Sequence, residues 1–137
     1  GAKGLTPIST LLRKAAKAIE RLVSLQSREL GLTARQMDVL LVLNAEPGLK
    51  SVEIGKRISM DKSTTAHLTH QMMGKGLIQQ EKGSYKSSLK NFLTPLGKSK
   101  IKSCVAIEKD LEAKVAAIAT TRATFAQKLE AITEIEG

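Results

Sequence analysis

The sequence is poor in aromatic residues. Only Tyr85, Phe92 and Phe125 are aromatic, which is 2% of the 137 residues. Proteins that hold single-stranded nucleic acid rely on aromatic side chains against which the bases stack. This scarcity therefore argues against a single-strand platform and against specific RNA recognition.

The sequence also has one cysteine and no long apolar run. Cys104 is alone, so an intrachain disulfide is excluded, which fits a reducing compartment. No stretch of about 18 apolar residues and no signal-peptide pattern is present. We therefore expect a cytoplasmic protein without a membrane partner.

Catalytic patterns are missing as well. We find no Ser/His/Asp arrangement with plausible supporting residues and no glycine-rich loop that would cradle a phosphate. Carboxylates are rare in the middle of the chain. The sequence thus predicts a protein that is not an enzyme and that uses no cofactor.

Positive charge is abundant, and it is concentrated. The formal net charge is +9 and the isoelectric point is about 9.9. Residues 50–102 hold eleven basic and three acidic residues, whereas residues 103–137 carry a net charge of −2. A surplus of this sign favours a polyanionic partner, nucleic acid before membrane. The middle third is where we expect that partner to bind.

Residues 61–76 are predicted to form one helix with two different faces. Asp61 is a good N-cap, and Gly76 stands where a C′ glycine is needed. At about 100° per residue the side chains divide onto two opposite faces. The partly apolar face carries Thr65, Leu68, Thr69 and Met72. The opposite face is small and polar, without a carboxylate, and it carries Ser63, Ala66, His67, His70 and Gly74.

A helix that packs its partly apolar face on the protein and exposes a face of small polar side chains suits insertion into the major groove of DNA. The alternative is an ordinary surface helix with a solvated outer face. The preceding segments favour the first interpretation. Thr33 and Gln36 form a capping-box pattern that starts a helix ending before Glu46-Pro47-Gly48. Ser51 is predicted to cap a short helix with Val52, Ile54 and Ile58 turned inward. Together these segments make a helix-turn-helix.

A basic β-hairpin is predicted directly after this helix. Residues 77–82 and 87–93 have strand character around a turn at Gly83-Ser84, with Leu89 and Leu93 on one face. Its lysines, which suit phosphate or minor-groove contact, are Lys82, Lys86 and Lys90. A ribbon in this place is the wing of a winged helix. The alternative is a solvated hairpin whose lysines only discourage edge pairing.

Long amphipathic helices are predicted on both sides of this unit. Thr6-Pro7 and Thr94-Pro95 each combine an N-cap residue with a proline at the first helical position. Apolar residues recur at helical spacing from Ile8 to Val23, from Leu96 to Ile118, and again from Phe125 to Ile135, with a break predicted at Thr120-Thr121. Such stripes are most simply buried together and against a second copy of the chain.

We therefore predict a mainly α fold with a small β-hairpin wing, of the α+β class. Residues 1–31 form an N-terminal dimerisation helix, and residues 32–94 form a winged helix-turn-helix domain that binds double-stranded DNA. Residues 95–137 form C-terminal dimerisation helices.

The order of these elements resembles the MarR family of bacterial winged-helix regulators. The matching pieces, which are specific in their joint order and spacing, are Leu32-Thr33-Ala34-Arg35-Gln36 with Val39-Leu40, Glu46-Pro47-Gly48-Leu49 with Ser51, Asp61-Lys62-Ser63-Thr64, Gly76-Leu77-Ile78, and Leu93-Thr94 with Gly97. The resemblance covers nearly the whole chain.

The resemblance implies a homodimer that binds a pseudo-palindromic operator, with one recognition helix per half-site. It implies that the residues facing the bases are Ser63, Thr64, Ala66, His67 and His70. It implies phosphate contacts from Ser51 and Lys62. Many members release DNA when a small phenolic or anionic molecule binds between the DNA-binding lobes and the dimer domain, and others sense oxidants through cysteine.

The sequence departs from the family pattern at two places. Where the wing usually has an Asp-x-Arg motif, this chain has Tyr85-Lys86-Ser87, and where many members have an arginine in the recognition helix it has His67. Lysine lacks the bidentate fork of arginine, and the charge of a histidine changes near neutral pH. We expect weaker or differently specified DNA contact, with a dependence on pH.

Other chemistry at these residues is less favoured. His67 and His70 stand three residues apart, as two metal ligands can, but zinc generally needs three or four protein ligands and no third is evident. We expect no metal. Lys100 and Lys102 beside Cys104 would favour a reactive thiol, but its place on an apolar stripe favours a buried, inert one. The four methionines are expected to fill gaps in the core.

The leading hypothesis is a dimeric transcriptional regulator, more specifically a repressor. The alternative is a winged-helix module that docks on another protein and has no operator of its own, a hypothesis suggested by the missing wing arginine.

Overall fold

The structure of the chain is a computed structural model that describes residues 6–83, 89–118 and 122–134. Its helices and strands, in chain order, are α1 (Ile8–Ser27), a single 3₁₀ turn η1 (Arg28–Leu30), α2 (Ala34–Ala45), α3 (Ser51–Ile58), α4 (Lys62–Gly74), β1 (Ile78–Lys82), β2 (Leu89–Leu93), α5 (Pro95–Ser99), α6 (Ile101–Ala116) and α7 (Arg122–Thr133).

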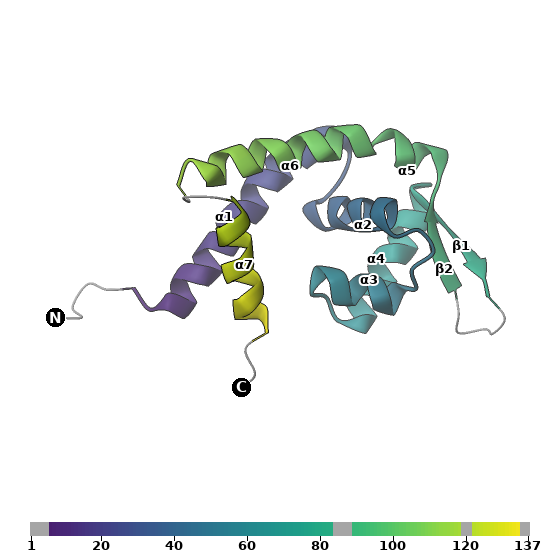
Figure 1. Cartoon of the computed structure of the whole chain (residues 1–137). Coiled ribbons are helices and arrows are strands. Elements are labelled where there is room, and N and C mark those ends of the chain that lie inside the picture. Colours follow the sequence, from purple (N-terminus) through teal and green to yellow (C-terminus); the bar gives the residue numbers. More distant parts are fainter. Residues whose placement is uncertain (1–5, 84–88, 119–121, 135–137) are drawn as a thin grey trace.

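These elements form two groups (Figure 1). Helices α2, α3 and α4 pack together beside the hairpin β1–β2, and α6 runs across α2 toward α1. Helices α1 and α7 lie on the opposite side of the molecule from the hairpin. The expected fold class, mainly helical with one small antiparallel hairpin, is confirmed.

The hydrophobic core is built around α2 and includes side chains of α3, α4 and α6. Met37, Val39, Leu40 and Ile54 are fully buried, and Cys104 and Ile107 reach the same cluster from α6. Met72 is fully buried, while Met60 and Met73 are half-buried against the cluster. The methionines therefore fill the core, as their flexible side chains allow.

Two of the expected helix starts are confirmed. The Thr33 hydroxyl accepts from the Gln36 N–H, and the Gln36 side chain accepts from the Thr33 N–H, both at 3.1 Å. This reciprocal pair is the capping box. At the start of α5 the Thr94 hydroxyl accepts from the Gly97 N–H at 3.1 Å, with Pro95 as the first helical residue.

Two other expected starts are wrong by one residue. Helix α1 begins at Ile8 with Pro7 as the N-cap, and no side chain caps it. At α3 the N-cap is Lys50 rather than Ser51, because the Glu53 carboxylate accepts from the Lys50 N–H at 3.0 Å. The Ser51 hydroxyl is used elsewhere, as described below.

The expectation that Val52 turns inward is also wrong, since 38% of it is exposed. Ile54 and Ile58 are four residues apart and share the buried face of α3. Val52 lies about 200° around the helix from Ile54, so it faces outward.

The region after Thr94 is not one long helix. Helix α5 ends at Ser99 and α6 begins at Ile101, with Lys100 between them. On β2, Leu89 and Leu93 share a face as expected, but 37% of Leu89 is exposed whereas Leu93 is buried. The predicted break at Thr120-Thr121 and the last apolar position, Ile135, lie outside the described residues.

A prediction concerns Gly97, which is buried in α5. A Cβ atom there would be pressed into the carbonyl oxygen of Leu77, a backbone atom that cannot move aside. We expect Gly97→Ala to lower the free energy of unfolding by about 1–3 kcal/mol, as overpacking does. Urea denaturation measures this loss.

The matched control is Gly74→Ala in α4, where a Cβ atom would meet nothing within 4 Å. Alanine there is expected to raise the free energy of unfolding by about 0.5 kcal/mol through its helix propensity. Equal effects at the two glycines would contradict the close approach of α5 to Leu77.

Candidate nucleic-acid interface

Helix α4 is fixed at its start by Asp61. The Asp61 carboxylate accepts from the Thr64 N–H at 2.7 Å and from the Thr64 hydroxyl at 2.8 Å. The backbone hydrogen bond from Thr64 is the main reason why the pKa of Asp61 is lowered. The cap therefore stays ionised, as an acidic group at the positive end of a helix is stabilised in that form.

The back of α4 is buried in the manner that the sequence predicted. Thr65 is fully buried, Leu68 and Met72 are buried, and Thr69 is 1% exposed. The Thr65 hydroxyl donates to the Asp61 carbonyl at 2.7 Å, and the Thr69 hydroxyl donates to the Ala66 carbonyl at 3.0 Å. Both polar groups on the buried face are thus satisfied, as burial requires.

The front of α4 is exposed along its length. The expected base-facing side chains are all in this exposed set: Ser63, Thr64, Ala66, His67 and His70. Lys62, at the first position of the helix, is exposed too. Past the cap, α4 carries no carboxylate, so its exposed front offers hydroxyl and imidazole groups without a repelling charge.

The hairpin lies beside α4 (Figure 1), and it carries part of the expected basic surface. Its strands pair antiparallel from Ile78 opposite Leu93 to Lys82 opposite Leu89. Lys82 and Lys90 are exposed. Glu81 stands opposite Lys90 in this register. Lys86, with Tyr85 and Ser87, lies outside the described residues.

Ser51 stands at the first position of α3, but its hydroxyl points into the protein. Ser51 is half-buried, and its oxygen lies 3.0 Å from the Thr69 hydroxyl of α4 and 3.4 Å from the Asn91 amide of β2. Asn91 is fully buried. Our sequence analysis missed it, although a polar residue between Leu89 and Leu93 on the inward face of a strand was a visible signal.

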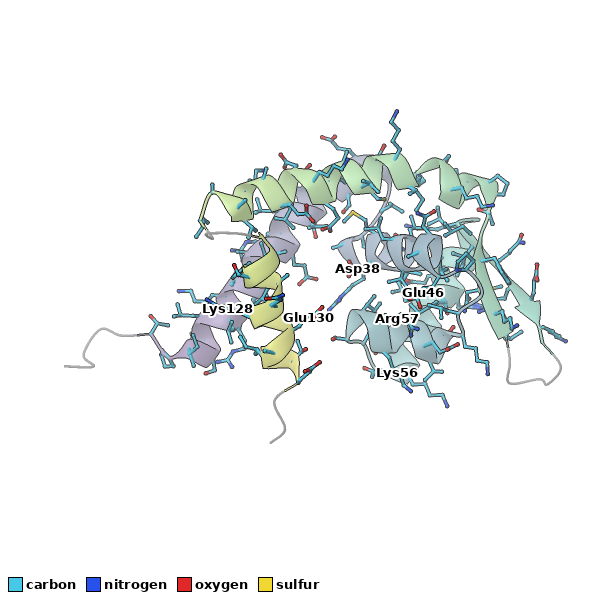
Figure 2. The ribbon with its side chains drawn as sticks, in the orientation of Figure 1. Asp38, Glu46, Lys56, Arg57, Lys128 and Glu130 are labelled. Carbon is cyan, nitrogen blue, oxygen red and sulfur yellow. The ribbon has the colours of Figure 1, made fainter. Side chains whose placement is uncertain are left out.

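Ion pairs hold the helix-turn-helix in shape. The Arg57 guanidinium donates from Nε and Nη2 to the two oxygens of Glu46, at 2.6 and 2.9 Å, and from Nη1 to the Glu53 carbonyl at 3.2 Å. Arg57 and Glu46 are labelled in Figure 2. The hydrogen bond from Arg57 lowers the pKa of Glu46. This fork ties α3 to the end of α2.

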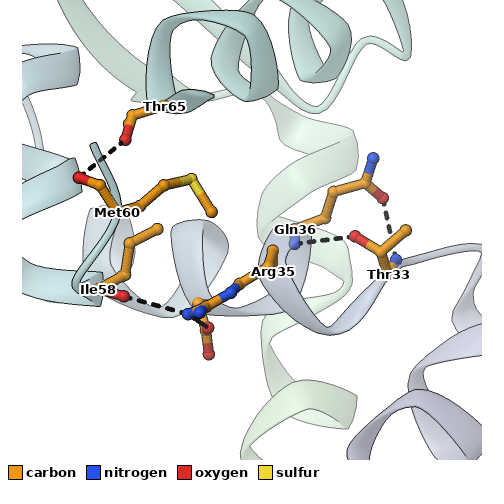
Figure 3. A network of polar contacts seen from close by, with 7 residues as sticks. Thr33, Arg35, Gln36, Ile58, Met60 and Thr65 are labelled. Atoms are coloured by element: carbon orange, nitrogen blue, oxygen red, sulfur yellow. Dashed lines mark hydrogen bonds and ion pairs between the residues drawn. The ribbon is translucent and has the colours of Figure 1, made fainter. Parts of the chain in front are cut away.

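A second contact ties α2 to the turn after α3 (Figure 3). The Arg35 guanidinium donates to the Ile58 carbonyl at 3.1 Å and pairs with Asp38 at 3.3 Å. Close by, the Thr65 hydroxyl reaches the Met60 carbonyl at 3.5 Å. The chain between α3 and α4 is therefore held from both sides.

A hollow of about 410 Å³ lies between α2, α3 and α6. Leu41, Val42 and Ile58 supply apolar walls, Asp38 and Glu108 supply carboxylates, and Arg57 supplies a guanidinium. Burial raises the pKa of Asp38 against the opposing effect of Arg35. Burial also raises the pKa of Glu108, and the negative charges of Asp38 and Glu112 add to this.

Other candidate chemistry has the following outcome. Within the described residues, no three His, Cys, Asp or Glu side chains are grouped as a metal site requires. Cys104 is fully buried, as expected, and burial raises the pKa of its thiol although Lys100 acts in the opposite direction. No described helix is both long and apolar enough to cross a membrane.

Comparisons with known proteins agree with this architecture. Residues 32–84 match the model of the MarR family. A search of curated proteins gave no match. The chain is similar to the Mycobacterium tuberculosis transcriptional regulator MosR, with a TM-score of 0.82, 19% identity, and 98% of this chain and 96% of that chain covered.

Two further structures are similar over nearly the full length. A cysteine-to-serine mutant of Escherichia coli MarR, solved with operator DNA, has a TM-score of 0.82 and 21% identity, with 96% of each chain covered. A Mycobacterium tuberculosis MarR family protein in complex with salicylic acid has a TM-score of 0.70 and 25% identity, with 95% of this chain and 98% of that chain covered.

The architecture is that of a winged helix-turn-helix set between long flanking helices. Residues 32–84 match the MarR family model, and the chain as a whole has the fold of the similar structures. The resemblance stated from its sequence motifs is thereby confirmed.

A prediction concerns Glu108, whose folded-state pKa is raised by burial. Above its folded-state pKa, such a carboxyl group is ionised in both states and destabilises the fold. Below its unfolded-state pKa it is protonated in both states and has no such effect. We therefore expect Glu108→Gln to raise the melting temperature by about 2 °C at pH 7. The gain should shrink to nothing as the pH falls below the ordinary carboxyl range.

The control is Glu130→Gln on α7, because Glu130 is exposed. Thermal unfolding followed by circular dichroism from pH 3.5 to 8 compares the three proteins. A gain at Glu108 that is the same at every pH would contradict the burial of its charge.

Proposed function

We propose that this chain acts as a homodimeric repressor, in the cytoplasm, on a pseudo-palindromic operator in duplex DNA. The coarser function, DNA-binding transcriptional regulation, is supported by the match of residues 32–84 to the MarR family model. The single observation that carries the proposal is the arrangement of α4, with its back buried and its carboxylate-free front exposed.

We assign the base contacts to the exposed front of α4: Ser63, Thr64, Ala66, His67 and His70. We assign phosphate contacts to Ser51, Lys62, Lys82, Lys86 and Lys90. Side chains on a helix front can reach base edges in the major groove, whereas lysines and the first N–H groups of a helix suit phosphates. For Ser51 the N–H at the start of α3 is the group that we assign.

Two similar structures, each solved with DNA, support the DNA partner. A MarR mutant was solved with operator DNA, and MosR was solved in complex with DNA. Those chains are 21% and 20% identical to this one, so they establish the shared fold, and the DNA contacts of this chain remain a proposal.

The homodimer is supported by apolar side chains that one copy leaves uncovered. On α1, 71% of Ile8 and 47% of Leu11 are exposed, and on α7 about two-fifths of Leu129 and of Ile132 is exposed. Both helices lie away from α4 (Figure 1). We propose residues 1–31 and 95–137 as dimerisation segments on either side of a DNA-binding domain at 32–94.

A small-molecule effector is the remaining part of the proposal. One similar protein was solved with salicylic acid, and we propose the hollow between α2, α3 and α6 as the place for a phenolic or anionic effector here. Asp38 and Glu108 in that hollow repel anions when ionised, whereas the Arg57 guanidinium, which also lines it, attracts them. The hollow thus offers both signs of charge beside its apolar walls.

The alternative function is a winged-helix module that docks on a protein and recognises no operator. The observation that favours it is the sequence Tyr85-Lys86-Ser87, which lacks the wing arginine. Selection from a random duplex library separates the two, because a docking module enriches no DNA motif.

The phosphate assignment predicts a change in salt dependence. We expect the double variant Lys82→Ala with Lys90→Ala to weaken binding to every duplex alike, and to reduce the slope of log affinity against log salt by about 1 to 2. Gel-shift titrations at several salt concentrations measure this slope. The control, Lys128→Ala on α7 (Figure 2), is expected to leave it unchanged.

The base assignment predicts a different effect. We expect His67→Ala with His70→Ala to lower affinity for the selected site by about 1–3 kcal/mol and to leave affinity for random duplex nearly unchanged. The same titrations, run on both duplexes, give the two affinities. If the histidine and lysine effects were exchanged, the assigned roles would be wrong.

The dimer predicts that a charge on the exposed apolar stripe blocks association. We expect Leu129→Glu to convert a dimer into a monomer in analytical ultracentrifugation, because an unpaired charge in an apolar interface is costly. The control Lys128→Glu changes charge by more, at the neighbouring exposed position. A wild-type protein that sediments as a monomer at 50 μM, on the order of the concentrations used for such measurements, would contradict the proposal.

A further inference from the structure

One buried side-chain amide lies where the wing, α3 and α4 meet. Asn91, on β2, is fully buried, and Thr69 of α4 is 1% exposed. The peptide groups of Asn91 pair with the segment before α3: its N–H donates to the Leu49 carbonyl and its carbonyl accepts from the Gly48 N–H, both at 2.9 Å. A polar group in this position is costly unless it is fully hydrogen-bonded.

The partners of the Asn91 side chain fix its orientation. Its Nδ2 lies 2.9 Å from the Leu49 carbonyl oxygen, which can only accept, so the NH₂ group must face that oxygen. Its Oδ1 accepts from the Gln80 side chain of β1 at 3.0 Å. The second N–H of Nδ2 reaches the Ser51 oxygen at 3.4 Å. Ser51 is therefore an acceptor toward Asn91.

The direction of the remaining bonds follows from counting protons. The Thr69 hydroxyl lies 3.0 Å from the Ala66 carbonyl, which again can only accept, so Thr69 uses its one proton there. Thr69 and Ser51 are 3.0 Å apart through their hydroxyl oxygens. Since Thr69 has no proton left, Ser51 must donate to Thr69. The one proton of the Ser51 hydroxyl is thereby used inside the protein.

We propose that Asn91, Ser51 and Thr69 are positioning residues that lock the wing to the recognition helix through a one-way chain of hydrogen bonds. The chain runs from Asn91 on β2 to Ser51 on α3 and then to Thr69 on α4. The Ser51 hydroxyl acts in this chain and does not donate to a phosphate. The inference rests on the proposed function and makes its phosphate contact at Ser51 a main-chain one.

The chain matters because it joins elements that must act together on DNA. Helix α4 carries the base-facing side chains and the hairpin carries Lys82 and Lys90, so their relative position sets the register of both on one duplex. Thr69 lies on the back of α4, one residue before His70 on the front. A shift of Thr69 therefore moves the reading face. Breaking one of these hydrogen bonds also leaves buried polar groups unsatisfied, so positions of the hairpin that only partly keep the bonds are unfavourable.

The first experiment tests the chain without DNA. Ser51→Ala, Thr69→Val and the double variant are unfolded thermally. If the two hydroxyls are hydrogen-bonded, the double variant loses clearly less in melting temperature than the sum of the two single losses. Losses in melting temperature that simply add would show that the two hydroxyls are not hydrogen-bonded, and would overturn the proposal. This result is independent of whether the protein binds an operator.

The second experiment tests positioning on DNA. The readout is the ratio of affinity for a duplex selected from a random library to affinity for a random duplex. We expect Thr69→Val and Asn91→Leu to lower this ratio by about tenfold, the effect of losing one buried hydrogen bond. Thr69→Ser, which keeps the hydroxyl, is expected to keep the ratio within about twofold of wild type.

The matched control is Thr65→Val. Thr65 is buried on the same face of α4, and its hydroxyl also donates to a carbonyl of the preceding turn, but no bond joins it to Ser51 or Asn91 among those described. Valine has the shape of threonine, so the packing of this position against Gly55 is kept, and we expect the variant to lower the melting temperature and leave the ratio unchanged. A Thr65 variant that lowers the ratio as much as Thr69→Val would overturn the proposal, because loss of stability alone would then explain both.

Ser51→Ala separates the two roles of the hydroxyl. As a positioning residue it is expected to lower affinity for the selected duplex only. A hydroxyl that donated to a phosphate would instead lower affinity for both duplexes by one factor, and that result overturns the inference. A wild-type protein that enriches no duplex contradicts the proposed function, and with it the role of these hydrogen bonds in DNA binding. The thermal unfolding of Ser51→Ala, Thr69→Val and the double variant still tests whether the hydrogen bonds exist.

Discussion

The structure depends on the close docking of the back of α4 against α3. Gly55 makes this approach possible, since a Cβ atom there would lie 2.6 Å from the Thr65 hydroxyl oxygen and 2.7 Å from the Met60 carbonyl oxygen. The contact buries Thr65, and farther along α4 Leu68 and Met72 are buried as well. Because this one side of the helix is fixed, the opposite side is held out toward solvent in a defined orientation, which is what reading a groove requires.

The other polar contacts act on the same unit from its edges. The Arg57–Glu46 fork ties α3 to α2, Arg35 holds the turn after α3, and Asn91 connects the wing. Exposed ion pairs contribute little stability singly, so we attribute to these contacts the fixing of shape more than the stabilisation of the fold. Residues 50–102, which include α3, α4 and the hairpin, carry a net charge of +8, whereas seven of the twelve large apolar side chains exposed in the described residues lie on α1 and α7.

The sequence alone was sufficient for features that local chemistry determines. The two faces of α4, the Asp61 cap and the Thr33–Gln36 box follow from spacing and from side chains that bond within one turn. The predictions that were wrong concern side chains whose roles are set by contacts with other helices and strands. The N-cap of α3 is Lys50, whose N–H donates to the Glu53 carboxylate, and the Ser51 hydroxyl instead has partners on α4 and β2, which no local pattern reveals. The sequence does place Asn91 as a polar residue on the face of Leu89 and Leu93, but its role depends on neighbours on β1, on α3 and in the segment before α3.

The base contacts proposed for the exposed front of α4 can be tested directly. The most direct measurement places a photoreactive amino acid at position 70, on that front, and in a second protein at position 130, on α7 (Figure 2). After irradiation with duplex DNA, we expect a covalent protein–DNA adduct from position 70 and none from position 130. An adduct from position 130 alone, or none from either position when the duplex is bound, would contradict these base contacts.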